Sequence, residues 1–351
     1  MKARGEIIED LVILLRGFFA TPVISSLGRL GVLQQMRSGK EFKVDDFNQV
    51  NNHKLLKDTF SYFLRLGLIE RSKNGAQTFI TTDLGFEVFR RANSFYVPHS
   101  YFDYLYRYHE MIQSPDGTVV PEVERLENVI GSGITHQRYF PPAISFLKRH
   151  ARFTTLVDIG CGDGHFLMSL IEKMPNMKLI GIDMSEVSTE ATKANISSKY
   201  PNVNLVTYCC DGSDINEWSR VVIENANPNA VAFAMWFFIQ EISKNDPDLI
   251  VDLLNRIREI FPNAPIVIGE MVKQPEQILV ENNHRSLIPE YLFFHDMSNQ
   301  GVLTWDNYQR ILTETGYQIG LEKLYDEVVG VDGQIVPSTF IWCLTPERKM
   351  Q

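Results

Sequence analysis

The chain contains few cysteines, few long apolar runs and less positive than negative charge. Its 351 residues include four cysteines, Cys161, Cys209, Cys210 and Cys343, and none belongs to a Cys-x-x-Cys pair. This excludes a disulfide framework, so we expect a cytoplasmic location. No apolar stretch approaches the roughly 20 residues of a membrane-spanning helix, and acidic residues precede the short apolar run at Leu11. We therefore expect neither a membrane span nor a secretory signal.

The deficit of positive charge is concentrated in one part of the chain. Lys and Arg number 34 against 43 Asp and Glu, for a net charge of −9. Residues 1–91 carry a net charge of +4 and the remainder −13. An acidic body repels nucleic acid but tolerates a small or cationic substrate. We therefore expect a small-molecule partner and no nucleic acid.

Residues 1–91 have the pattern of a small helical domain. Apolar residues recur at helical spacing from Leu11 to Leu33, with predicted breaks at Pro22, Gly28 and Gly31. A second amphipathic helix at 54–68 is followed by a β-hairpin. This order predicts a winged-helix-like domain, which would serve DNA binding or dimerisation. Dimerisation is favoured because the second helix offers aromatic residues more than a basic face.

Residues 92–150 are rich in aromatic side chains and are predicted to be a helical linker. Most of these rings are expected to pack between domains, and a few to line a small-molecule pocket. Arg125 and Arg138 are the cations here that could meet a substrate carboxylate. Arg125 is the stronger candidate for a substrate-binding residue.

Residues 151–351 alternate between strand and helix patterns. Strands are predicted at 154–158, 178–182, 203–208, 230–238, 265–270, 317–325 and 338–344. Helices are predicted at 164–174, 186–199, 214–224, 246–260 and 304–315. This alternation predicts an α/β fold with a doubly wound, Rossmann-like sheet covered by helices on both faces.

The first strand of this region ends in an acid and three glycines. Asp158 is followed by Gly160, Gly162 and Gly164 at every second position. Glycines let a backbone turn approach a nucleoside-bearing ligand closely, and the next helix directs its first amides at that ligand. Asp183 ends the next apolar run, at about the separation suited to ribose hydroxyls.

This G-x-G-x-G pattern after an acid resembles motif I of the S-adenosylmethionine-dependent methyltransferases. The whole chain resembles the small-molecule O-methyltransferase-like family, which has an N-terminal dimerisation domain. The resemblance implies a homodimer in which Asp158 and the three glycines hold the methionine part of the cofactor. It further implies that Asp183 binds the ribose and that Asp211 with Gly212 contacts the adenine, although Asp211 would also suit a turn. Trp236, at the end of the fourth strand, completes the expected cofactor set.

The chain departs from that family after the fourth strand. Members that methylate phenol oxygens carry a His-Asp pair there, with the histidine as general base. This sequence has Gln240 and Glu241 instead. A glutamine amide cannot accept a proton near neutral pH. Either activity is lost, or Glu241 is the base, or the site performs different chemistry.

The combination of Gln240, Glu241 and a later His295 resembles the family's metal-dependent branch, which methylates the β-carbon of 2-oxo acids. That resemblance implies a divalent ion such as Zn²⁺ or Fe²⁺ held by these three residues, which would stabilise an enolate. The predicted substrate is 2-ketoarginine first and an arylpyruvate second. Asp296 is the favoured proton-abstracting base, with His284 and a metal-bound hydroxide as alternatives.

Two other functions remain open at this point. One is metal-free O-methylation of a small hydroxylated metabolite, with Glu241 or an unrecognised residue as base. The other is a regulator that binds S-adenosylmethionine and uses its winged helix on DNA.

Overall fold

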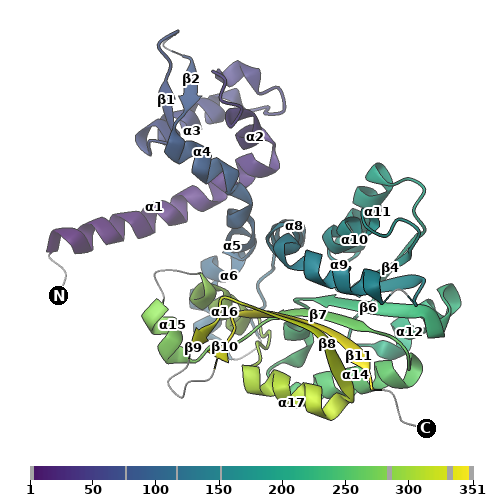
Figure 1. Ribbon diagram of the computed structural model, residues 1–351. Coiled ribbons are helices and arrows are strands. Elements are labelled where there is room, and N and C mark those ends of the chain that lie inside the picture. Colours follow the sequence, from purple (N-terminus) through teal and green to yellow (C-terminus); the bar gives the residue numbers. More distant parts are fainter. Residues whose placement is uncertain are drawn as a thin grey trace. The chain divides into compact units, whose positions relative to one another are not determined.

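The computed structural model describes residues 4–75, 77–115, 118–150, 152–282, 287–329 and 335–347 (Figure 1). The chain divides into two compact units, Met1–Thr135 and His136–Gln351. The predicted division of the chain into three domains, with boundaries at residues 91 and 150, stays a prediction. Each unit has its own hydrophobic core.

The first unit is mainly helical and contains one β-hairpin. Its elements are α1 (Arg4–Arg29), α2 (Val32–Met36), η1 (Val44–Asp46), α3 (His53–Arg65), β1 (Ile69–Arg71), β2 (Phe79–Thr81), α4 (Asp83–Arg90), η2 (Ala92–Phe95), α5 (Tyr96–Ser100), α6 (Phe102–Tyr106), α7 (Tyr108–Gln113) and α8 (Arg125–His136). The predicted second helix and hairpin are confirmed as α3 and the antiparallel pair β1–β2. Phe60 and Phe63 of α3 are fully buried. The aromatic side chains of this helix therefore serve the core.

The predicted breaks in the first helix at Pro22 and Gly28 are wrong. Helix α1 continues through both residues and ends at Arg29, before Gly31 adopts a left-handed φ of 74°. Proline lacks the N–H that would bond to the carbonyl four residues earlier, on Phe18. Phe18 is exposed, so water can satisfy that carbonyl. The lost hydrogen bond thus falls at a partly exposed position, where the helix tolerates a proline.

Helix α1 also corrects the expectation about membrane-spanning segments. Between Leu11 and Arg29 it is long and apolar enough to cross a bilayer by length and composition, and 22% of that window is buried. In the sequence, the charge of Arg16 and the proline at position 22 divide the apolar residues into short runs. In the structure, one continuous helix joins the apolar residues on both sides of them. Length and composition of this kind are weak evidence, since core helices and signal sequences share them.

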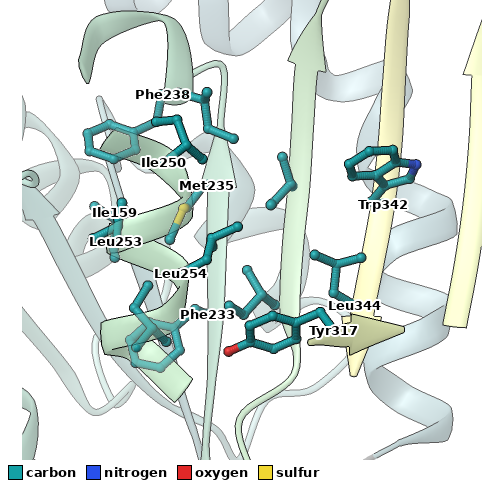
Figure 2. Close-up of a cluster of buried hydrophobic side chains, with 14 of the residues drawn as sticks. Ile159, Phe233, Met235, Phe238, Ile250, Leu253, Leu254, Tyr317, Trp342 and Leu344 are labelled. Atoms are coloured by element: carbon teal, nitrogen blue, oxygen red, sulfur yellow. The ribbon is translucent and has the colours of Figure 1, made fainter. Parts of the chain in front are cut away.

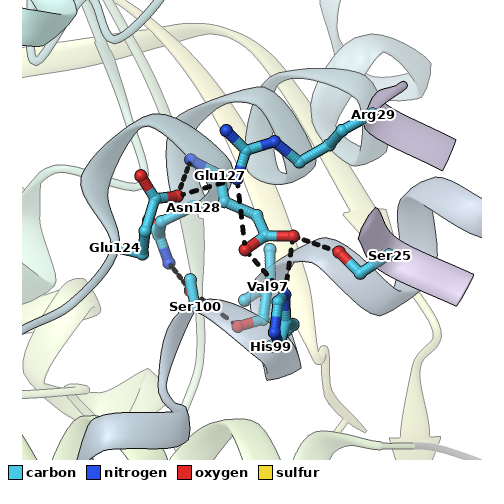
Figure 3. Close-up of polar contacts among 8 residues, drawn as sticks. All are labelled: Ser25, Arg29, Val97, His99, Ser100, Glu124, Glu127 and Asn128. Atoms are coloured by element: carbon cyan, nitrogen blue, oxygen red, sulfur yellow. Dashed lines mark hydrogen bonds and ion pairs between the residues drawn. The ribbon is translucent and has the colours of Figure 1, made fainter. Parts of the chain in front are cut away.

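A buried carboxylate connects three helices of the first unit (Figure 3). Glu127 of α8 is 1% exposed and accepts a hydrogen bond from the Ser25 hydroxyl of α1. His99 Nδ1 of α5 lies 2.8 Å from a Glu127 oxygen, and Arg29 Nη1 of α1 lies 3.6 Å from it. Because a buried charge requires partners, these contacts connect α1, α5 and α8 to one another.

The second unit is an α/β sandwich around a seven-stranded sheet. Its elements are η3 (Gln137–Tyr139), α9 (Phe140–Arg149), β3 (Thr155–Ile159), α10 (His165–Ile171), β4 (Lys178–Asp183), α11 (Glu186–Lys199), β5 (Leu205–Cys209), α12 (Ile215–Asn225), η4 (Pro228–Ala230), β6 (Val231–Trp236), α13 (Ile239–Ser243), α14 (Pro247–Ile260), β7 (Ile266–Met271), α15 (Glu276–Asn282), α16 (Ile288–Met297), α17 (Trp305–Thr315), β8 (Tyr317–Tyr325), β9 (Val328–Val329), β10 (Ile335–Val336) and β11 (Thr339–Pro346). The strand order is β5-β4-β3-β6-β7-β11-β8. Strands β3 to β7 run parallel, and β11 is antiparallel to both neighbours. The predicted doubly wound sheet is confirmed.

Successive residues of the central strands point to opposite faces of the sheet and pack into two separate hydrophobic cores. Leu156 of β3 packs with residues of α9 and α10, whereas Val157 packs with residues of α12, α14 and α17. Figure 2 shows part of the second core, where Phe233 and Met235 of β6 face Leu253 and Leu254 of α14. Burial of both faces explains why these strands read as continuous apolar runs. The sheet therefore presents its carboxyl edge as a rigid platform.

The Glu127 cluster generates a stability prediction. We expect Glu127→Ala to lower the free energy of unfolding by about 1–3 kcal/mol, because it removes the acceptor of the buried Ser25 hydroxyl and the shared carboxylate partner of His99 and Arg29. Urea denaturation measures this change. Glu124→Ala is the matched control, since Glu124 is half exposed and its contact with Arg29 is worth about 1 kcal/mol or less. Equal effects of the two variants would contradict the proposed importance of burial.

Candidate functional site

The glycine turn after β3 has the geometry that the sequence predicts. Gly160, Gly162 and Gly164 adopt φ values of 78°, 55° and 86°, which other residues rarely adopt. The backbone amides of Gly160 and Cys161 both donate to the carbonyl of Ile182, on the neighbouring strand β4. The turn is therefore held against β4 and leads directly into α10.

Asp158, immediately before this turn, is a buried carboxyl group in an unfavourable setting. It is 1% exposed, and its Oδ1 has no hydrogen-bond partner among the described residues. Burial, with a smaller contribution from the negative charge of Asp183, raises the pKa of Asp158 to about 8. A strongly perturbed acid at the carboxyl edge of a parallel sheet is typical of a ligand-binding site.

Asp183 organises the turn from the next strand. Its Oδ2 accepts a hydrogen bond from the Gly162 amide at 3.0 Å, and its Oδ1 accepts one from the Ser185 amide at 2.9 Å. The side chain thus orders the glycine turn as well as lying where a ribose would be expected. Its ribose role stays a prediction.

Asp211 and Gly212 each have a role in the local structure. Asp211 Oδ1 accepts hydrogen bonds from the Ser213 amide and hydroxyl, both at 2.8 Å, which is the turn role that the sequence left open. A Cβ on Gly212 would lie 2.6 Å from the ring of Phe238, so only glycine allows this packing. The predicted adenine contact of both residues stays a prediction.

Trp236 lies in the core beneath this edge of the sheet. Its ring packs against Phe140 and Phe166, with centroids 4.9 and 5.1 Å away. Its indole Nε1 is buried and has no hydrogen-bond partner in the described part of the chain. A buried indole N–H without an acceptor leaves a donor available near the cofactor edge. The cofactor role predicted for Trp236 stays untested.

The three residues predicted to hold a metal come together from two helices. Gln240 and Glu241 lie on α13 and His295 lies on α16. Gln300 links them: its backbone amide donates to the His295 carbonyl at 2.9 Å, and its side-chain amide donates to Glu241 Oε1 at 2.8 Å. The Gly301 amide donates to the Gln240 carbonyl at 2.8 Å. These hydrogen bonds join the two helices that carry the predicted ligands, and the metal role of the three side chains stays a prediction.

The donor atoms of this trio suit a metal in part. His295 Nδ1 lies 2.5 Å from the Tyr291 carbonyl, so it donates its proton there and Nε2 carries the lone pair. Gln240 Oε1 is buried and accepts no hydrogen bond from any described residue. Glu241, however, already accepts from Gln300. Across the described residues no group of three or more His, Cys, Asp or Glu side chains could hold a metal ion.

The candidate catalytic residues are not all placed at this site. Asp296 is exposed although its neighbour His295 is buried, because consecutive residues of α16 point in different directions. Arg125 is the first residue of α8 and belongs to the first unit. His284 lies outside the described residues. The roles of Asp296 and Arg125 stay predictions.

Two residues of the site were missed from the sequence. Glu270 ends β7, is fully buried, and accepts hydrogen bonds from the amides of Ile239 and Met271 at 2.9 Å. Burial raises its pKa to about 8. An acid at the end of an apolar strand was the available signal, as for Asp158. Gln300 carries no local signal, since only the fold brings it to α13.

The two buried acids generate a prediction that separates stability from binding. Because the folded-state pKa of Asp158 is raised, its contribution to stability is complete below about pH 4, its unfolded pKa, and is lost as pH rises through about 8. We expect Asp158→Asn to raise the melting temperature of the ligand-free protein at pH 8 and to leave it nearly unchanged at pH 4. We expect the same change to weaken binding of S-adenosylmethionine about tenfold or more, as calorimetry would measure.

Glu270→Gln is the matched control for this experiment. It removes a second buried acid whose pKa is also about 8, so it should reduce the same pH dependence. Since Glu270 contacts α13 and not the glycine turn, cofactor affinity should be retained. Loss of cofactor affinity in both variants alike would contradict a specific role for Asp158.

Known proteins resemble part of the second unit in sequence. A methyltransferase-domain family model matches residues 151–316. Trans-aconitate 2-methyltransferase of Acidovorax sp. (strain JS42) is 35% identical over 83 residues, which are 23% of this chain and 29% of that protein. O-methyltransferase 12 of Dictyostelium discoideum is 22% identical over 176 residues, 50% of this chain and 42% of that protein. The chain thus aligns with less than half the length of these curated relatives.

Solved structures show the same fold over nearly the full length. An O-methyltransferase family protein from Burkholderia thailandensis matches with a TM-score of 0.61 at 12% identity, covering 99% of this chain and 100% of that chain. Human N-acetylserotonin methyltransferase, solved with S-adenosylmethionine, matches with a TM-score of 0.55 at 13% identity, covering 99% of each chain. Residues 151–316 thus match a methyltransferase-domain model, and the chain as a whole has the fold of these solved methyltransferase structures.

Proposed function

We propose that this protein transfers a methyl group from S-adenosylmethionine to a hydroxyl oxygen of a small molecule. The family model and the fold support the cofactor and the reaction class. The observation that carries the choice of oxygen is His295, a buried imidazole on α16, the helix whose end the Gln300–Gly301 segment joins to α13. Gln240 occupies the position where the resembling family keeps its catalytic histidine, so a base must come from elsewhere.

His295 has the properties of a proton acceptor. Burial lowers its pKa below the ordinary value of a histidine, so the ring is neutral near pH 7. Its Nδ1 proton is donated to the Tyr291 carbonyl, which orients the ring and leaves Nε2 as the basic nitrogen. This arrangement resembles other general bases, in which a second group holds the tautomer.

The transfer follows directly from these groups. His295 Nε2 takes the proton of the acceptor hydroxyl as the oxygen attacks the sulfonium methyl carbon. The carbon–oxygen bond forms while the carbon–sulfur bond breaks, and its electron pair returns to sulfur, giving a neutral thioether. Asp158 and the glycine turn hold the cofactor, and the acceptor lies against α13 and α16.

A second candidate is metal-dependent methylation of the β-carbon of a 2-oxo acid. It is favoured by the convergence of Gln240, Glu241 and His295 and by the unpartnered Gln240 oxygen. A Zn²⁺ or Fe²⁺ ion bound there would act as a Lewis acid for the keto oxygen. In this candidate His295 Nε2 would bind the metal and would not accept a proton, which makes the two functions separable.

Replacement of His295 tests the proposed reaction. We expect His295→Ala to lower kcat for hydroxyl acceptors about 100-fold or more, with the Kd of S-adenosylmethionine unchanged, because a positioned base contributes about 10² to 10⁴. We expect the wild-type rate to fall only as pH drops below the lowered pKa of His295, hence below about 6.5. Labelled cofactor with panels of phenols and 2-oxo acids provides the assay.

His150→Ala is the matched control, because His150 also bonds through Nδ1 to a carbonyl four residues earlier but is exposed. Metal analysis of the same preparations separates the candidates. Stoichiometric metal that disappears in His295→Ala, together with turnover of 2-oxo acids only, would establish the second candidate. Full activity of His295→Ala on hydroxyl acceptors would sink the first.

We also propose that a second copy of this chain covers the outward faces of α1. Ile13, Leu14 and Phe19 are each more than 60% exposed, and Leu11, Leu15 and Phe18 are each more than half exposed. A continuous apolar surface of this kind marks an interaction site. Dimerisation is the role that the sequence predicts for the first unit. The alternative stays a regulator that uses this unit to bind DNA.

Charge on this surface should prevent dimerisation. We expect the wild-type protein to sediment as a dimer and the double variant Ile13→Glu, Leu14→Glu to sediment as a monomer, since buried carboxylates would oppose association. Leu55→Glu, at an exposed leucine of α3, should leave the dimer intact. A soluble wild-type monomer would refute the proposal, and flotation of the protein with lipid vesicles would assign α1 to a membrane instead.

A further inference from the structure

Two buried amide oxygens, on segments that backbone hydrogen bonds join to each other, accept no hydrogen bond in the described part of the chain. Gln240 Oε1 and Gln300 Oε1 are both shielded from solvent, and neither has a partner among the described residues. Both side chains are about nine-tenths buried. A buried carbonyl oxygen without a donor costs free energy that folding alone does not recover. Two such oxygens in one neighbourhood call for a ligand.

The orientation of the Gln300 amide follows from its partner. Its Nε2 donates to Glu241 Oε1 at 2.8 Å, and a carboxylate can only accept. The amino side of this amide must therefore face Glu241, and its oxygen faces the other way. The Gln300 backbone amide is also fixed, since it donates to the His295 carbonyl at 2.9 Å.

Gln240 is held next to Gln300 by the backbone. The Gly301 amide donates to the Gln240 carbonyl at 2.8 Å, and the Ser243 hydroxyl donates to the Gly301 carbonyl at 2.5 Å. The segments that carry Gln240 and Gln300 are thus hydrogen-bonded to each other, although the two residues are far apart in sequence.

The chemistry of this cluster is uniform. The Gln240 and Gln300 oxygens are acceptors, the Glu241 carboxylate is an acceptor, and the basic nitrogen of His295 is an acceptor. A ligand that satisfies them must bring N–H or O–H groups. A ligand with one hydroxyl would satisfy His295 only.

We infer that Gln240 and Gln300 bind a second hydrogen-bond donor on the methyl acceptor, a hydroxyl or amino group adjacent to the hydroxyl that reacts. The substrate class is therefore a compound with two neighbouring donors. This inference rests on the proposed O-methylation and specifies its substrate. Gln300 is in addition a positioning residue, because it joins Glu241 to His295.

Matched aromatic compounds test this inference. Catechol and 2-aminophenol carry two adjacent donors, whereas 2-methoxyphenol keeps the ring and one hydroxyl. Rings suit this edge because Phe237, three residues before Gln240, stacks on His136 with centroids 3.7 Å apart. Calorimetry on protein saturated with S-adenosylhomocysteine gives affinity, and labelled S-adenosylmethionine gives kcat/KM.

We expect wild-type protein to prefer the two-donor compounds about tenfold or more, which corresponds to about 1.4 kcal/mol. We expect the preference to fall to about twofold or less in Gln240→Met and Gln300→Met, since methionine keeps the volume but lacks the amide oxygen. Cofactor affinity should stay unchanged. Gln274→Met is the control, because Gln274 is equally buried in the segment after β7, and it should retain the wild-type preference.

The outcomes separate this inference from the proposed function. Equal affinity of the wild type for all three compounds, binding of none, or an unchanged preference in both variants overturns the inference. A preference in binding without any methyl transfer leaves the donor site standing and counts against the proposed function. Loss of bound metal in Gln240→Met, with no change in preference, assigns the two oxygens to a cation and overturns the inference.

Discussion

Asp158 and Asp183 are two acids at the ends of adjacent parallel strands, and the glycine turn that leads into α10 depends on both. Asp183 is satisfied by two backbone amides, whereas Asp158 is buried with an unpartnered oxygen. The resulting rise in the pKa of Asp158 is a cost that the ligand-free fold carries. A cationic ligand would relieve it by supplying the missing donor. Local costs of this kind are common where binding has priority over stability.

The opposite side of the site depends on hydrogen bonds between segments distant in sequence. Glu270 at the end of β7 accepts from the first amides of α13 and so fixes where that short helix begins. Gln300 then ties α13 to the end of α16. Substitution of the family's usual histidine by Gln240 changes what this edge can do. Compared with the resembling family, α13 here carries a buried acceptor in place of a base, and we propose that His295 supplies the imidazole from another helix.

The first unit is stabilised by different interactions. Its internal order relies on one buried carboxylate, Glu127, that joins three helices, and on a compact aromatic core around Phe60 and Phe63. Its longest helix nevertheless presents apolar side chains outward over residues 11–19. Exposed apolar area of this extent is unfavourable in water, and this is the observation on which the proposed covering of α1 by a second copy of the chain rests.

The sequence by itself determined the α/β sheet and the glycine turn. Asp158, Gly160 and Gly164 lie within one short segment, and apolar periodicity is a local property, so their arrangement needed no tertiary information. The strands came out within a few residues of their predicted limits. Local rules failed at Pro22, where the helix continues through a partly exposed proline, and along α1, which is longer than the sequence pattern predicts. Only the tertiary structure placed Gln300 between Glu241 and His295, buried Glu270 beneath α13, and joined Ser25, His99 and Glu127. Apart from the local Gln300–His295 bond, these contacts link residues from 28 to 102 positions apart, and their existence depends on how helices pack, which no local pattern encodes.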